Sequence, residues 1–281
     1  LLRSFAPPPV ALWGTVIFGA ISTLPALNDG GNYTETYWQL PTAVVYGALL
    51  RYMGTGCQRQ AELSAPQDRP WRPFLVPMEI GHLVLAGVGA TAATLLKPQG
   101  VLHLLGATGA VLLVWLPPIR GTPLAQGRKV VGVLPVLALP FLTAAAVLTP
   151  VVEYFVHQGA AAELWSQVVV YNCVYAGVLP PSAALENLAQ ALRWTPQFAS
   201  LWLFTALAAV FCWHRVAPGP PTPLRASAST EHTPPSVFPL LVLWFLLDTA
   251  GTAVGGQFYP HYFLLAVPST AALLTYTLMH I

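Results

Sequence analysis

Long, uninterrupted apolar stretches dominate this sequence. Of its 281 residues, 55% are hydrophobic and only 8% are charged, whereas a soluble domain carries about 25% charged residues. These charges are too few to cover a water-facing surface, and several stretches between them approach the roughly 20 residues that a membrane-spanning helix needs. Because helices satisfy their own backbone hydrogen bonds inside lipid, the sequence predicts an all-α membrane protein.

Eight stretches qualify as membrane spans, and prolines are expected at their ends and kinks. The predicted spans are residues 9–27, 36–53, 76–96, 101–117, 130–148, 197–214, 236–253 and 262–280. The second and fourth are short or polar for a span, so counts of seven and six stay open as alternatives. The predicted fold is one transmembrane domain, a polytopic helix bundle of about eight spans with interfacial helices on its outer side.

The expected orientation follows from the cations, because Lys and Arg near span ends are retained on the cytoplasmic side. With the N-terminus of the chain inside, ten of the twelve Lys and Arg residues fall in the cytoplasm, and only Lys97 and Arg193 fall outside. With one span fewer, every later loop would change sides, and the cations would be divided between the two sides of the membrane. The charge pattern therefore favours eight spans and a cytoplasmic N-terminus for this segment.

Two segments differ from the spans in composition. Residues 149–196 mix aliphatic and aromatic residues with Glu and Asn, which is typical of helices lying in a membrane interface, and Pro180 and Pro181 are expected to separate two such helices. Residues 216–235 are rich in Pro, Ser and Thr and have little to bury. They are predicted to form a flexible cytoplasmic linker.

Several function classes find no support. The net charge of +2 comes from scattered residues, which argues against a nucleic-acid partner. The cysteines Cys57, Cys173 and Cys212 lie far apart without a metal-ligand spacing, so a disulfide scaffold and a zinc site are not expected. Nucleotide-binding and zinc-protease motifs do not occur. No required cofactor is inferred, and a divalent metal stays an open alternative.

Polar residues that could bind a ligand or take part in catalysis gather on the predicted outer side. They lie at residues 28–35, 97–99, 171–172 and 255–262. Loops distant in sequence that meet at one end of a helix bundle can assemble a binding site. We therefore expect the four segments to share one pocket.

Two carboxylates and two histidines within the spans are candidates for a function. Carboxylates in a membrane usually face the bundle interior or a wet cavity, so Asp248 is expected to line the outer cavity and Glu79 to lie at the cytoplasmic interface. His82 and His103 are candidate ligands of a haem or of a chlorophyll magnesium. A hydrogen-bonded contact between helices is the more common role of such a histidine.

Residues 255–263, Gly-Gly-Gln-Phe-Tyr-Pro-His-Tyr-Phe, are followed by Pro268. This pattern resembles a late transmembrane motif of bacterial membrane glycosyltransferases of the GT-C class, in the branch of the protein O-mannosyltransferases and the aminoarabinose transferase of lipid A. Three further segments resemble that family's motifs in the family's order: residues 32–35 (Asn-Tyr-Thr-Glu), residues 95–98 (Leu-Leu-Lys-Pro), and Tyr171-Asn172 with Tyr175. Together the matches cover most of the chain.

The resemblance implies transfer of a sugar from a polyprenyl-phosphate donor to an extracytoplasmic acceptor, at a bacterial inner membrane. In that chemistry a carboxylate acts as base on the acceptor hydroxyl, and cations steady the leaving phosphate. Carried over residue by residue, Glu35 becomes the catalytic or supporting carboxylate and Lys97 contacts the phosphate. The other residues implied to bind substrate are Asn32, Gln257, Tyr259, His261 and Tyr262.

The chain departs from the family pattern at two points. Gln257 stands where the family often has Arg, and the family's Asp-containing loop after its first span is expected upstream of the matched region. The chain is therefore expected to start partway into a longer protein, or to have lost the enzyme core. Purely structural roles are alternatives for two of these residues. The Lys97 side chain can extend to the lipid headgroups, and the negative charge of Glu35 can stabilise a helix N-terminus.

Two other functions remain as alternatives. The first is a non-catalytic integral subunit that scaffolds a larger membrane complex and contacts lipids or pigments. The second, a secondary transporter, would predict broken half-helices or internal symmetry, and neither is evident in the sequence.

Overall fold

The computed structural model describes residues 7–22, 34–64, 77–115, 128–177, 179–194, 196–216, 237–254, 256 and 258–279. Within these ranges the chain is helical almost throughout and has no strand. The predicted all-α fold is therefore confirmed. The predicted linker at 216–235 lies, except for Val216, outside the described residues.

In each of the eight predicted spans, the residues that the structure describes are almost all helical. The long helices are α1 (Pro8–Ser22), α3 (Thr34–Ser64), α4 (Pro77–Leu96), α5 (Leu102–Trp115), α6 (Arg128–His157), α10 (Pro196–Val216) and α11 (Val237–Ala253). The last predicted span divides into a 3-10 helix, η5 (Pro260–Ala266), and α12 (Val267–Leu278). Shorter elements are η2 (Pro98–Val101), α7 (Ala161–Trp165), the π-helix η3 (Ser166–Val170), α8 (Tyr171–Gly177) and α9 (Pro181–Trp194).

Three helical stretches are long and apolar enough to cross a membrane. They are Pro77–Leu96, Pro98–Trp115 and Val133–His157, and two further apolar helices, Pro8–Ala20 and Val237–Ala253, are shorter. These stretches fit a membrane protein. The count of eight spans stays a prediction.

Prolines explain where some helices begin and why one boundary differs from expectation. Helices α4, α9 and α10 each begin with Pro, which is favoured at the first helical position because its missing N–H has no partner to lose there. In contrast, α6 contains Pro135, Pro140 and Pro150 without ending. It continues past the predicted span end at residue 148 to His157, so the predicted interfacial segment starts inside this helix.

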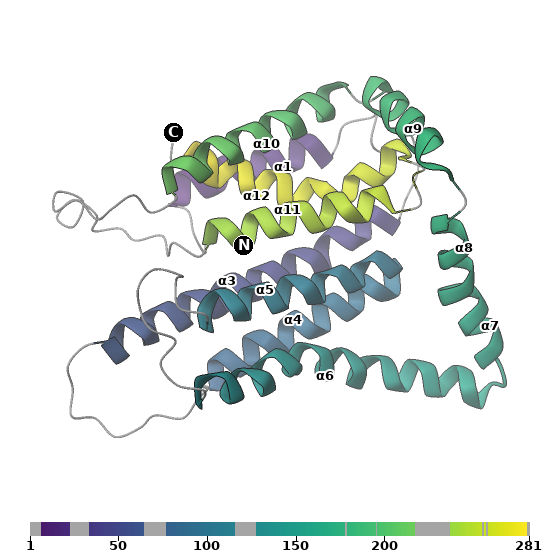
Figure 1. Cartoon of the computed structure of the whole chain (residues 1–281), viewed down its shortest axis with the longest axis horizontal. Coiled ribbons are helices and arrows are strands. Elements are labelled where there is room, and N and C mark those ends of the chain that lie inside the picture. The colour runs from purple at the N-terminus through teal and green to yellow at the C-terminus, as the bar shows by residue number, and fades with distance from the viewer. Residues whose placement is uncertain are drawn as a thin grey trace.

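The long helices form two groups that lie side by side (Figure 1). One group contains α3, α4, α5 and α6, and the other contains α1, α10, α11 and α12. Helix α11 packs against both α5 and α12 and so joins the groups. The joint is filled by large side chains: Tyr46 of α3 stacks on Trp244 of α11 with ring centroids 4.1 Å apart, and both rings are fully buried.

Several helix ends meet at one end of the bundle, on the right in Figure 1. Helix α3 begins there, α4 ends there, and the turn from α11 into η5 lies there. Helices α7 and α8 cross the ends of the long helices and lead to α9. Residues 97–99, which follow α4, and residues 258–262, which follow α11, are thereby brought to one end.

Close packing of α4 on α6 depends on a glycine. A Cβ atom at Gly87 would lie 2.7 Å from the carbonyl oxygen of Pro140, whereas one at Gly81, on the same helix, would meet nothing within 4 Å. Small residues let helix backbones approach closely in membranes. Gly87 therefore sets the distance between these two helices.

We expect Gly87→Ala to lower the free energy of unfolding by about 1–3 kcal/mol, the usual cost of overpacking. Gly81→Ala is the matched control and should leave stability unchanged or raise it by up to about 1 kcal/mol, because alanine favours the helix. Thermal unfolding in detergent, followed by tryptophan fluorescence, measures both. Equal effects of the two substitutions would contradict the close contact.

Candidate functional site

A tight turn positions the start of η5. Gly256 has φ +64° and Phe258 has φ +48°, a left-handed conformation that is uncommon for a bulky residue. The Asn187 side chain of α9 donates a hydrogen bond of 3.1 Å to the carbonyl oxygen of Gly256. A Cβ atom at Gly256 would lie 2.7 Å from that of Ala184. Helix α9 therefore holds this turn in place, and with it the residues that follow.

Three aromatic rings follow the turn and contact one another. Tyr259 stacks on His261 at 5.6 Å between ring centroids, with 11° between the ring planes. Tyr262 packs edge-on against both, at 5.5 Å from Tyr259 and 4.8 Å from His261. Tyr259 is exposed, and the other two rings are partly exposed. The group thus presents two phenol rings and an imidazole to the surface.

Lys97 completes this group. Its Nζ lies 3.8 Å from the centroid of the Tyr262 ring, which is cation–π geometry. Lys97 follows the last residue of α4, its N–H donates to the carbonyl oxygen of Ala93, and its own carbonyl accepts from Gly100 in η2. We call Lys97, Tyr259, His261 and Tyr262 the end cluster. It joins two segments of the chain that are more than 150 positions apart.

An open hollow lies next to Lys97 in the chain. It has a volume of about 210 Å³ and is lined mostly by apolar groups, from Pro98, Gln99, Val101, Leu102, Asn172 and Val254. Asn172 follows the π-helix η3 and donates hydrogen bonds to the carbonyl oxygens of Gln167 and Val168. The hollow therefore combines residues from η2, α5, α8 and the end of α11.

The structure places the sequence-predicted site residues as follows. Lys97, Tyr259, His261 and Tyr262 come together in the end cluster. Glu35 lies in the first turn of α3, at the same end of the bundle, with its side chain outside the described part of the structure. Asn32 and Gln257 lie outside the described residues.

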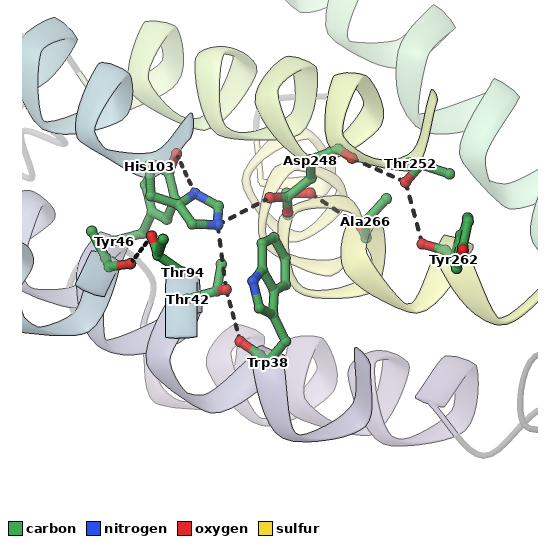
Figure 2. A network of polar contacts seen from close by, with 11 residues as sticks. Trp38, Thr42, Tyr46, Thr94, His103, Asp248, Thr252, Tyr262 and Ala266 are labelled. Carbon is green, nitrogen blue, oxygen red and sulfur yellow. Dashed lines mark hydrogen bonds and ion pairs between the residues drawn. The ribbon is translucent and has the colours of Figure 1, made fainter. Parts of the chain in front are cut away.

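A second polar site lies inside the bundle and was not predicted as a pair. Asp248 of α11 and His103 of α5 are 0% and 1% exposed, and Nε2 of His103 lies 3.9 Å from Oδ1 of Asp248. We call these two residues the core pair (Figure 2). The expectation that Asp248 lines an outer cavity is wrong, because packing of α11 on α5 and α12 buries it. Glu79, in the first turn of α4, is also buried, with 3% exposure, and its position at the cytoplasmic interface stays a prediction.

Uncharged side chains surround the core pair. Thr42 Oγ1 lies 3.5 Å from Nε2 of His103, and the hydroxyl oxygen of Tyr46 lies 3.4 Å from Nδ1. The ring of Trp38 lies 4.7 Å from the His103 ring, centroid to centroid. Both nitrogens of His103 thus face groups of the protein itself. Whether His82 or His103 ligates a cofactor stays a prediction, and the described residues contain no group of three or more potential metal ligands.

Depth along the helices is the signal that could have revealed the core pair. His103 is the second residue of α5, which runs inward from the end where the end cluster lies. Asp248 precedes the last residue of α11, Ala253, by five positions, and α11 ends at that same end. At about 1.5 Å per residue, both residues lie within two helical turns of that end. A carboxylate and an imidazole at equal depth are candidates for pairing.

Comparisons with protein-family models, with curated proteins and with solved structures find no match to this chain.

The contact between Lys97 and Tyr262 makes a measurable prediction. In a double-mutant cycle of Lys97→Met and Tyr262→Leu, we expect a coupling free energy of about 0.5–1 kcal/mol, the range for partly exposed cation–π pairs. Tyr262→Phe is the control, because phenylalanine keeps the ring face, and it should retain the coupling. Unfolding in detergent measures the cycle, and additive effects of the two substitutions would contradict the contact.

Proposed function

We propose that this chain is a membrane glycosyltransferase of the GT-C class, which moves a sugar from a polyprenyl-phosphate donor to an acceptor on the extracytoplasmic side. The end cluster is the observation that carries the proposal. It joins the segment that resembles the family's Lys-Pro motif to the segment that resembles its late transmembrane motif. An arrangement of this kind is what a shared binding site requires.

The chemistry of the donor matches the groups at this end of the bundle. A polyprenyl phosphate has an anionic headgroup and an apolar chain. Lys97 supplies a positive charge that suits phosphate, and the phenol of Tyr259 and the imidazole of His261 supply hydrogen-bond donors. The open, mostly apolar hollow that begins at Pro98 offers a surface for the first isoprene units.

The remaining roles follow the resemblance. Glu35, in the first turn of α3 at the same end, is assigned as a carboxylate that serves the acceptor hydroxyl. Asn32 and Gln257 are assigned to substrate binding. With the N-terminus of this segment inside a bacterial inner membrane, the end cluster faces the extracytoplasmic side and α7 to α9 lie in the outer interface. Eight crossings complete this topology.

The test is sugar transfer by the full-length protein in liposomes, with a radiolabelled polyprenyl-phosphate sugar as donor. We expect Lys97→Ala to lower kcat/KM about 10- to 100-fold, since a charge-assisted hydrogen bond is worth about 1.5–3 kcal/mol. Glu35→Gln should lower kcat. Arg193→Ala is the matched control, because Arg193 is an exposed cation on α9, and it should leave both parameters unchanged.

Two outcomes would reject parts of this proposal. Wild-type activity that both Lys97→Ala and Glu35→Gln leave intact would remove the site assignment. A wild-type protein without transfer activity that purifies in a stable complex with other membrane subunits would favour the scaffolding role instead.

A further inference from the structure

The core pair is independent of the end cluster and has no part in the proposed transfer reaction. Its two side chains belong to α5 and α11, the helices at the junction of the two helix groups. Asp248 and His103 are each at least 99% buried. An ionisable residue at such a position is costly in a membrane protein and marks a functional site by default.

Charge balance limits how many protons the core pair can hold. An ionised carboxylate with a neutral imidazole would leave one negative charge in the bundle, and a protonated carboxyl with an imidazolium would leave one positive charge. Either uncompensated charge costs several kcal/mol in the interior. The pair has no net charge when it holds one titratable proton, either on the carboxyl group beside a neutral imidazole or on the imidazole as an imidazolium beside a carboxylate.

Within the described parts of the chain, no other charged side chain faces the pair. The groups that face it are Thr42, Tyr46 and Trp38 from α3, Trp244 from α11 and Ser269 from α12. Tyr46 is the one titratable side chain among them, and it is neutral at physiological pH. The balance therefore has to be reached within the pair itself.

The hydrogen-bond pattern around the core pair indicates internal water. The distance of 3.9 Å between Nε2 and Oδ1 is too long for a direct hydrogen bond. Neither oxygen of Asp248 and neither indole N–H of Trp38 or Trp244 has a partner of ordinary hydrogen-bond geometry, although all four atoms are buried. Ser269 and Trp244 lie close enough to interact with the carboxyl. Buried groups of this kind are usually satisfied by internal water, which accepts from the indoles and donates to the carboxyl.

We propose that His103 and Asp248 form a hydrated proton-binding site, which holds one proton between the two side chains and encloses internal water. The site links α5 to α11. Loss or gain of a proton would leave an unbalanced charge between the two helix groups. One turn after Asp248, Thr252 Oγ1 donates to the backbone carbonyl oxygen of Asp248 and lies 3.3 Å from the backbone carbonyl oxygen of Tyr262 (Figure 2), so the segment that carries the site is also joined to η5.

Solid-state NMR of the full chain in lipid bilayers tests the proton count. The sequence contains three Asp residues, Asp29, Asp68 and Asp248, so carboxyl-labelled aspartate gives a simple spectrum. Nitrogen-15 labelling of histidine reports the imidazole, and a carbon–nitrogen distance measurement selects His103 by its proximity to Asp248 without any substitution. At pH 7 we expect one proton on the pair, either a protonated carboxyl with a neutral imidazole or a carboxylate with an imidazolium.

Two results would overturn the proton count. One is a carboxylate beside a neutral imidazole, and the other is a protonated carboxyl beside an imidazolium. Asp248→Asn and His103→Gln confirm the assignment, and Glu79→Gln and His82→Gln are matched controls that should leave both signals in place. Where the single variants do not fold, the selected wild-type signals decide. Cross-peaks between water and the indole N–H groups of Trp38 and Trp244 are expected, and their absence would overturn the hydration of the site.

Discussion

Polar and charged side chains are costly inside a helix bundle in lipid unless they are paired or hydrogen-bonded, and this cost limits where polar chemistry occurs in this chain. Side chains along the shared faces of the helices are mostly apolar, and residues with polar or charged groups accumulate where helices end. The end of α4, the start of α3 and the turn into η5 meet at one end of the bundle. The end cluster follows from this meeting of helix ends.

The end cluster depends on a few local features of the backbone. Gly100 folds η2 back against Ala93 and Thr94 so closely that a Cβ atom would not fit, and this fold fixes the direction in which Lys97 leaves α4. Gly256 and Phe258 are left-handed and direct η5 towards Lys97, and Asn187 holds the carbonyl oxygen of Gly256. Two short 3-10 helices, rather than the long helices themselves, therefore bring the cation and the aromatic rings together.

Sequence reasoning succeeds here where the signal is local. Pro77 and the Lys97-Pro98 pair bound α4, and their positions in the sequence predict its ends to within one residue. It fails where tertiary packing decides: α6 continues through Pro150 to His157, although a proline in that position is expected to end a helix. The core pair was missed because Asp248 and His103 are 145 positions apart, and only the packing of α11 on α5 shows that they face each other.

Photo-crosslinking with a benzophenone-tagged polyprenyl phosphate tests the central claim most directly, because it asks where a lipid phosphate binds irrespective of the sugar. The account predicts that adducts map to residues 97–102 and 258–262, and that inorganic pyrophosphate or untagged polyprenyl phosphate competes with them. Adducts spread along the lipid-facing surfaces of α6 and α10, with none at Lys97 or η5, would contradict it.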